Sequence, residues 1–192
     1  MYNFFAYMSR MKLIRRWSLM KSVTDENIAE HSAEVAQIAH ALAVIANKIY
    51  KKEVNADRVA TLALYHECSE VITGDLPTPI KYYNPEIREA YKKLESVADA
   101  KLLSMIPKEL QDEYAPLISQ STDTYEHSLV KAADKLSAYV KCIEELKSGN
   151  REFAKAEVAL KAEIEAYFHL SEVKYFCDRF LPSYSKTLDE LD

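Results

Sequence analysis

A chain of 192 residues, 48% of them hydrophobic and 29% charged, is long enough for one soluble globular domain with a sizeable core. Its net charge of -5 excludes a general nucleic-acid binder, because there is no excess of Lys and Arg to neutralise a phosphate backbone. We expect a single domain over residues 1–192, with neither a nucleic-acid polymer nor a membrane as partner, since the N-terminus shows no signal or membrane-spanning pattern.

The cysteine and glycine content indicates the cellular setting and the fold class. Cys68, Cys142 and Cys177 are odd in number and far apart, which predicts no disulfide framework and fits a reducing, cytoplasmic protein. The chain has only two glycines, whereas sheet proteins need glycine in hairpins and bulges. Gly74 and Gly149 both follow long helical patterns, as helix C-caps do. The composition therefore predicts an all-α fold.

Apolar periodicity and capping signals place the helices in chain order. Asn27 with Glu30 has the spacing of a capping box, and Asn84-Pro85 has the pattern of an N-cap followed by proline at the first helical position. Two prolines predict a stiff non-helical loop over 75–79. The expected helices cover 2–14, about 27–50, 55–72, 85–106, 108–119, 125–148, about 150–168 and 171–181.

Three of these helices carry side chains that bind metals. His31 and His66 lie on apolar stripes, where a lone histidine is usually a hydrogen-bonded core residue. Glu67 follows His66, Glu70 is expected on the same helix face as His66, and Asp134 stands in mid-helix, where aspartate is unfavourable. Imidazole and carboxylate donors without thiolate suit a divalent first-row metal such as Mn, Co, Fe or Zn. Such a metal with an open position activates water, which predicts a hydrolase.

Four segments resemble a known family: FFAYMSRMKLIRRW, NIAEHS, YHxxSEVxTGDLPTPxKY and SLVKAADKLSAYVKCIEEL. They are similar to the bacterial 5′-deoxynucleotidases of the YfbR type, in the HD superfamily of metal-dependent phosphohydrolases. The resemblance extends from residue 4 to at least 150 and is most specific over 65–82. It implies an HD-domain helical bundle that hydrolyses deoxyribonucleoside 5′-monophosphates to deoxynucleoside and phosphate. It also implies a divalent metal, Co²⁺ or Mn²⁺, and a homodimer.

Matching this chain to the family position by position implies a set of site residues. Glu70 is the expected acid/base group, and Arg16 is expected to hold the phosphate, since a guanidinium matches phosphate oxygens in fork geometry. Trp17 is expected to pack near C2′ and exclude a 2′-hydroxyl, although a core role is its ordinary alternative. The implied metal ligands are His31, His66, Glu67 and Asp134, and the implied substrate contacts are Arg16, Trp17, His31, Asp75, Leu76, Pro77, Thr78 and Asp134.

One position departs from the family pattern. The superfamily is named for a His-Asp pair, and this chain has His66-Glu67, whose carboxylate is one methylene longer. Such a change leaves two alternatives, a working variant or a weakened, non-catalytic nucleotide-binding protein. Another HD phosphohydrolase, acting on a nucleoside triphosphate, a cyclic nucleotide or an alarmone, is a further alternative. His40, His127 and His169 have no partner in register and receive no role.

Overall fold

Helices are the regular secondary structure of the part of the chain that the structure describes. The structure is a computed structural model, and it describes residues 1–81 and 83–192, with only the backbone of Thr78. These residues form no β-strand, which confirms the all-α prediction, and none of their helices is long and apolar enough to cross a membrane. In chain order the elements are α1 Phe4–Met8, η1 Met11–Leu13, α2 Ile28–Lys48, α3 Ala56–Tyr65, α4 Glu70–Thr73, α5 Thr78–Lys81, α6 Pro85–Ser104, α7 Lys108–Ile118, α8 Tyr125–Lys147, η2 Arg151–Phe153, α9 Ala154–Glu165, α10 Ser171–Arg179, η3 Leu181–Ser185 and η4 Leu188–Glu190.

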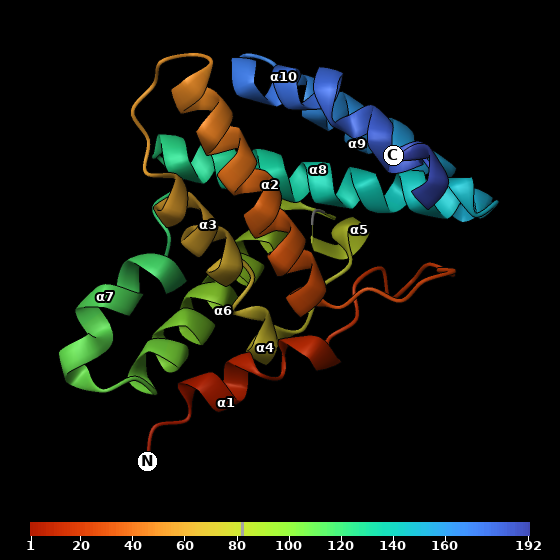
Figure 1. Cartoon of the computed structure of the whole chain (residues 1–192). Helices are drawn as coiled ribbons and strands as arrows, with labels where there is room; N and C mark the ends of the chain where they lie inside the picture. Colours follow the sequence, from red (N-terminus) through yellow and green to blue (C-terminus); the bar gives the residue numbers. More distant parts are fainter. Residues whose placement is uncertain (82) are drawn as a thin grey trace.

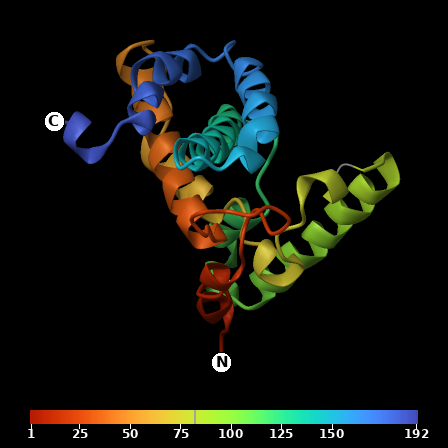
Figure 2. The same ribbon diagram turned by 90° about the vertical axis from the view of Figure 1, so that its right-hand side faces the viewer.

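The core lies where α2 crosses α3 and α8 (Figure 1). Val35 and Leu42 of α2, Val59 of α3 and Leu136 of α8 have no exposed surface, and they belong to one apolar cluster. Burying each such side chain contributes roughly 1.5–3 kcal/mol. Figure 2 shows α8 in the centre with α2, α9 and α10 around it, while α6 extends sideways from this body. The helices that carry the candidate ligands are therefore also the helices that form the core.

The predicted helix ends at the capping residues are confirmed. The Asn27 side chain accepts hydrogen bonds from the amides of residues 29 and 30, and Glu30 accepts one from the Asn27 amide at 3.2 Å. Asn84 caps α6, with Pro85 in its first turn. Gly74 ends α4 with a φ of 74° and Gly149 follows α8 with a φ of 85°, the left-handed conformation that glycine adopts without strain.

The prediction of one helix over 2–14 is wrong. α1 ends at Met8, and the chain then tightens, because the Arg10 amide bonds to the Tyr7 carbonyl and the Leu13 amide to the Arg10 carbonyl, both at 2.8 Å. These bonds span three residues instead of four, so Met11 begins a 3₁₀ turn. The tighter turns leave both Phe4 and Met11 buried.

The prediction of one helix over 55–72 is also wrong, and the interruption falls on His66 and Glu67, two of the predicted metal ligands. His66 Nδ1 lies 2.6 Å from the carbonyl oxygen of Ala63, the acceptor that the amide of Glu67 would use in a continuing α-helix. α3 therefore ends at Tyr65, and α4 begins only at Glu70. His66 and Glu70 accordingly do not share a face of one helix.

The loop predicted over 75–79 is shorter than expected. The structure starts α5 at Thr78, and the Pro77 carbonyl accepts from the amides of Ile80 and Lys81 at 2.8 and 3.0 Å. Pro79 stands in the first turn of α5, where its missing N–H is not needed. Only residues 75–77 remain non-helical after Gly74.

Residues 14–27, here called the strap, connect η1 to α2 without regular structure and appear in Figure 1 as the red-orange loop beside α2. The two ends of the strap lie side by side. The Arg16 amide bonds to the Glu26 carbonyl at 2.9 Å, and the Ile28 amide bonds to the Ile14 carbonyl at 3.0 Å. This short antiparallel contact brings Arg16 next to the start of α2.

Three polar residues of α8 and the turn after it, here called the clamp, hold the outer part of the strap: Lys141, Glu145 and Asn150. The Glu145 carboxylate accepts from the amides of Val23 and Thr24 at 2.8 and 3.1 Å. Lys141 Nζ lies 2.6 Å from Glu145 and donates to the Thr24 carbonyl, and Asn150 also donates to Glu145. Lys141 and Glu145 are almost fully buried, so each offsets the desolvation of the other.

We predict that Glu145→Gln destabilises the protein by roughly 3 kcal/mol at neutral pH, because it leaves a buried lysine without its counter-ion. Burial alone would raise the pKa of Glu145, but Lys141 and the amide donors lower it to about 2. The stabilising effect is therefore full above pH 4.5 and is lost as the pH falls toward 2. Urea unfolding of both proteins across this pH range measures the difference.

The control is Glu144→Gln, which alters an exposed neighbour on the same helix and should change stability by less than about 0.5 kcal/mol. A Glu145 effect that does not shrink between pH 4.5 and 2 would show that the clamp does not act through its charge.

Candidate active site

The four predicted metal ligands converge from three helices. One ligand atom each of His31, His66, Glu67 and Asp134 can be chosen so that all lie within 4.8 Å of one another. His31 Nε2 lies 3.1 Å from Asp134 Oδ1 and 3.7 Å from Glu67 Oε1, and His66 Nε2 lies 3.9 Å from the same Asp134 oxygen. His31 belongs to α2, His66 and Glu67 follow the end of α3, and Asp134 belongs to α8.

Both imidazoles are held so that Nε2 faces the cluster. His66 Nδ1 donates to the Ala63 carbonyl, and His31 Nδ1 lies 3.0 Å from the hydroxyl of Ser137. Ser137 in turn donates to Glu34 at 2.5 Å. Hydrogen bonds of this kind fix the tautomer of a histidine and leave the other nitrogen free to bind a metal.

Unpaired buried atoms indicate that the cluster fits a cation. Among the described residues, His66 Nε2 and Glu67 Oε2 are buried and have no hydrogen-bond partner. Leaving such atoms without a partner costs about 1–3 kcal/mol each, a cost that a bound cation removes. Two imidazole nitrogens and two carboxylates are the donors that Mn, Co, Fe or Zn accept. The residues present therefore fit a divalent metal.

The charges of the cluster are strongly coupled. Burial raises the pKa of both carboxyl groups, but the histidines outweigh it for Asp134, and Arg16 with the histidines outweighs it for Glu67, so both pKa values fall below their usual range. Burial alone would lower the pKa of His31, but Glu67 and Asp134 outweigh it, and the net effect raises the pKa to about 9. A histidine must be neutral to bind a metal, so metal binding at this site displaces a proton.

Glu67 stands where the His-Asp pattern has aspartate, and its longer side chain reaches both the cluster and Arg16. Its Oε1 lies 3.8 Å from His66 Nε2 and 2.8 Å from Nη1 of Arg16. One carboxylate oxygen therefore faces both the cluster of predicted metal ligands and a guanidinium. The longer side chain therefore has a cationic partner in the strap.

Arg16 and Trp17 come to the cluster on the strap. The Arg16 side chain is only 12% exposed, and although burial lowers its pKa, Glu67 and Glu26 raise it above the usual value. Trp17 has a φ of 58°, and its ring packs against Phe153 with 5.2 Å between centroids. The Trp17 side chain is therefore partly buried against an apolar cluster, and its indole N–H donates a hydrogen bond to Glu26 at 2.8 Å.

Glu70 and the loop after Gly74 lie near the cluster. Glu70 is 6% exposed, and its Oε2 has no hydrogen-bond partner among the described residues. Burial, with repulsion from Glu67 and Asp75, raises the pKa of Glu70 to about 9, so this carboxyl group carries a proton at neutral pH. Burial also raises the pKa of Asp75. Asp75, Leu76 and Pro77 are half-buried, and the side chain of Thr78 lies outside the described residues.

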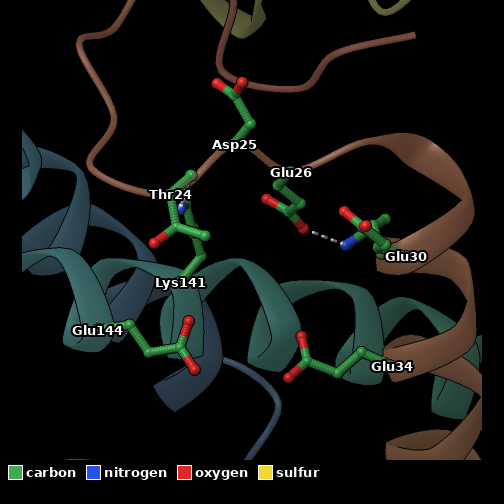
Figure 3. Close-up of a pocket in the computed structure, with 8 residues that line it drawn as sticks. Thr24, Asp25, Glu26, Glu30, Glu34, Lys141 and Glu144 are labelled. Carbon is green, nitrogen blue, oxygen red and sulfur yellow. Dashed lines mark hydrogen bonds and ion pairs between the residues drawn. The ribbon is translucent and has the colours of Figure 1, made fainter. Parts of the chain in front are cut away.

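A hollow of about 260 Å³ adjoins the cluster through His31 and Glu26 (Figure 3). Its lining is Thr24, Asp25, Glu26, Glu30, His31, Glu34, Lys141 and Glu144. Most of these side chains are acidic, so the hollow repels a phosphate.

The structure adds residues that sequence reasoning missed. Glu26 contacts the cluster from the strap, and Ser137 with Glu34 supports His31. No periodic pattern singles out Glu26, which precedes the cap of α2 and could as well be a solvated loop residue. Of the unassigned histidines, His40 is 3.8 Å from Asp57 and His169 bonds to a backbone carbonyl. His127 is different: its buried Nδ1 has no hydrogen-bond partner among the described residues, and burial, with repulsion from Lys131 and His66, lowers its pKa.

Comparison with known proteins places this geometry in a family. A family model described as 5′-deoxynucleotidase YfbR-like matches residues 3–184. A 5′-deoxynucleotidase of Vibrio vulnificus is 54% identical over 190 residues, covering 98% of this chain and 97% of that protein. The 5′-deoxynucleotidase YfbR of Escherichia coli O1:K1 is 52% identical over 190 residues, covering 98% and 95%.

A solved structure agrees with these relatives. The HD-domain phosphohydrolase of Listeria innocua has a TM-score of 0.83 and 29% identity to this chain, covering 95% of this chain and 88% of that one. The helical fold, the His-acid pair and the sequence matches lead to one assignment. The chain belongs to the YfbR-like 5′-deoxynucleotidases, which are phosphoric monoester hydrolases with the HD-domain fold.

Proposed function

We propose that this chain hydrolyses deoxyribonucleoside 5′-monophosphates to deoxynucleoside and phosphate, with His31, His66, Glu67 and Asp134 holding one divalent metal. The observation that carries the proposal is the convergence of these four side chains, with unpaired buried atoms, beside Arg16. Membership of the family supports the 5′-deoxynucleotidase reading over the triphosphate, cyclic-nucleotide and alarmone alternatives.

Each of the other site residues has a role that follows from its position. When bound, a divalent metal supplies a water of lowered pKa for attack on phosphorus. Arg16 holds phosphate oxygens and offsets their charge, as a guanidinium does in fork geometry. Glu70 holds a proton at its carboxyl group and donates it to the leaving O5′.

The sugar is recognised by the strap and by the loop after Gly74. Trp17 packs near C2′, so that a 2′-hydroxyl meets an apolar ring and loses its hydrogen-bond partners. Asp75 accepts a hydrogen bond from the 3′-hydroxyl, and Leu76, Pro77 and Thr78 complete the substrate loop. His31 and Asp134 face the phosphate as well as the metal.

The finer expectations of the sequence remain part of the proposal. The family resemblance implies Co²⁺ or Mn²⁺ as the metal and a homodimer as the assembly, and the odd number of widely separated cysteines fits the cytoplasm as the location. The donor set of two imidazoles and two carboxylates is compatible with either metal.

The first test is inorganic phosphate released from deoxy- and ribonucleoside 5′-monophosphates with Co²⁺, with Mn²⁺ and with chelator. We expect metal-dependent release from the deoxy substrates and at least about 100-fold less from their ribo counterparts, because a buried hydroxyl without partners is strongly rejected. Metal and nucleotide binding without release of phosphate would establish a non-catalytic nucleotide-binding protein instead.

Arg16→Ala should lower kcat/KM by about 100- to 1000-fold, the effect of removing one group that stabilises the transferring phosphoryl group. Metal content, measured by elemental analysis, should stay unchanged. The matched control is Arg15→Ala, because Arg15 is 71% exposed and pairs with Asp25 on the surface. Loss of metal from the Arg16 variant would assign Arg16 a structural role.

Glu67→Asp restores the His-Asp pair and should hold or raise kcat, since aspartate offers the same donor oxygens. The shorter side chain should also weaken the contact with Arg16, so any loss should appear in KM. Steady-state kinetics at saturating metal separates the effect on kcat from the effect on KM. Abolished activity with metal still bound would mean that the site is adapted to glutamate.

A further inference from the structure

A single carboxylate on the strap joins the proposed phosphate-binding arginine, the proposed sugar-binding tryptophan and a proposed metal ligand. Glu26 Oε2 accepts a hydrogen bond from Trp17 Nε1 at 2.8 Å. Its Oε1 lies 3.5 Å from Nε of Arg16, an ion-pair contact in which Nε makes no hydrogen bond to any described residue, and 3.4 Å from Nδ1 of His31. The Glu26 side chain is only 12% exposed, so these contacts form in a poorly solvated place, where they are stronger than in water.

The local backbone makes Trp17 dependent on such a contact. Its φ of 58° lies in the left-handed region, which costs a non-glycine residue about 1–2 kcal/mol. A conformation of this kind persists only where the surroundings hold it. Two contacts restrain the indole, ring packing against Phe153 and a hydrogen bond to the carboxylate of Glu26. Of these two, the hydrogen bond to Glu26 fixes the direction of the N–H.

Figure 3 shows how the strap aims this carboxylate. Glu26 points from the strap toward α8, whereas its neighbour Asp25 points away. Asp25 is 67% exposed and pairs with Arg15 on the surface. Adjacent acidic residues thus have different surroundings, and only Glu26 contacts the residues placed at the substrate.

We propose that Glu26 is a positioning residue that holds the Trp17 indole and the Arg16 guanidinium in the orientation met by the substrate, and thereby sets the preference for the deoxy sugar. The proposal rests on the function proposed above, since it acts through Trp17 at C2′ and Arg16 at the phosphate. Without Glu26 the indole rotates about its side-chain bonds, the space at C2′ opens, and a 2′-hydroxyl is rejected less strongly.

Trp17 is the only tryptophan of the chain, so its emission reports on this contact directly, separately from activity. Time-resolved anisotropy, excited where tyrosine does not absorb, measures local rotation of the indole. In Glu26→Ala we expect a fast component that the wild type lacks. Glu26→Gln, which keeps one acceptor oxygen for Trp17 and the volume of the side chain, should show a smaller one, and the control Asp25→Ala should match the wild type.

The kinetic arm compares kcat/KM for a deoxy- and a ribonucleoside 5′-monophosphate. In Glu26→Ala the deoxy-to-ribo ratio should fall about ten-fold, the size of one lost hydrogen bond to a charged group. Trp17→Phe has no indole N–H, so the hydrogen bond to Glu26 is already absent in that variant. Adding Glu26→Ala to it should therefore leave the deoxy-to-ribo ratio nearly unchanged, because the effects of two interacting residues are not additive. Metal content should stay intact, because Ser137 still bonds to His31.

An unchanged anisotropy decay in a folded Glu26→Ala or Glu26→Gln protein would overturn the proposal. An indole that becomes mobile with no change in the deoxy-to-ribo ratio would overturn the specificity role. If Glu26→Ala does not fold, the isosteric Glu26→Gln carries both measurements. A wild type that releases no phosphate would refute the proposed function, and the anisotropy of the same variants would still test whether Glu26 holds Trp17.

Discussion

The structure depends on the burial of two carboxylates, Glu67 and Asp134, at the crossing of its central helices. A carboxylate taken out of water is costly unless cations or hydrogen-bond donors surround it. Here the surroundings come from His31, His66 and Arg16, which reach the same point from different parts of the chain. The packing of α2, α3 and α8 therefore serves the site as much as the core, because the same helices supply the charges and their partners.

Local irregularities of the fold follow from that requirement. α3 stops where the His66 side chain bonds to the carbonyl of Ala63, and the chain leaves helical geometry at His66 and Glu67, two of the proposed metal ligands. The strap has no regular structure of its own and takes its shape from polar contacts, those of Glu26 with Trp17 and those of the buried Lys141–Glu145 pair with Val23 and Thr24. Regular helices supply rigidity together with His31 and Asp134, and the irregular segments between them supply Arg16, Trp17, His66 and Glu67.

The sequence predicted the parts of this structure that depend on local rules. Caps at Asn27 and Asn84 and the glycine at 74 placed helix ends correctly, because each acts within one turn of the backbone. The convergence of His31 with Asp134 was foreseeable from residue type and from resemblance to a family. The end of α3 at Tyr65 was not, because helical periodicity continues through a position where a side chain competes for a carbonyl. Glu26 escaped notice for a similar reason: its partners lie in contacts that depend on how the strap folds back.

Trp17 shows where this chain gives up stability. At Gly74 and Gly149 the left-handed backbone is occupied by the residue that adopts it freely, whereas at position 17 it is occupied by the bulkiest side chain of all. The ring of Phe153 and the carboxylate of Glu26 offset the strain locally. Selection for stability alone would favour glycine or asparagine at such a backbone position. A tryptophan there agrees with the proposed contact of Trp17 with the substrate, in which stability and activity would make opposite demands on one side chain.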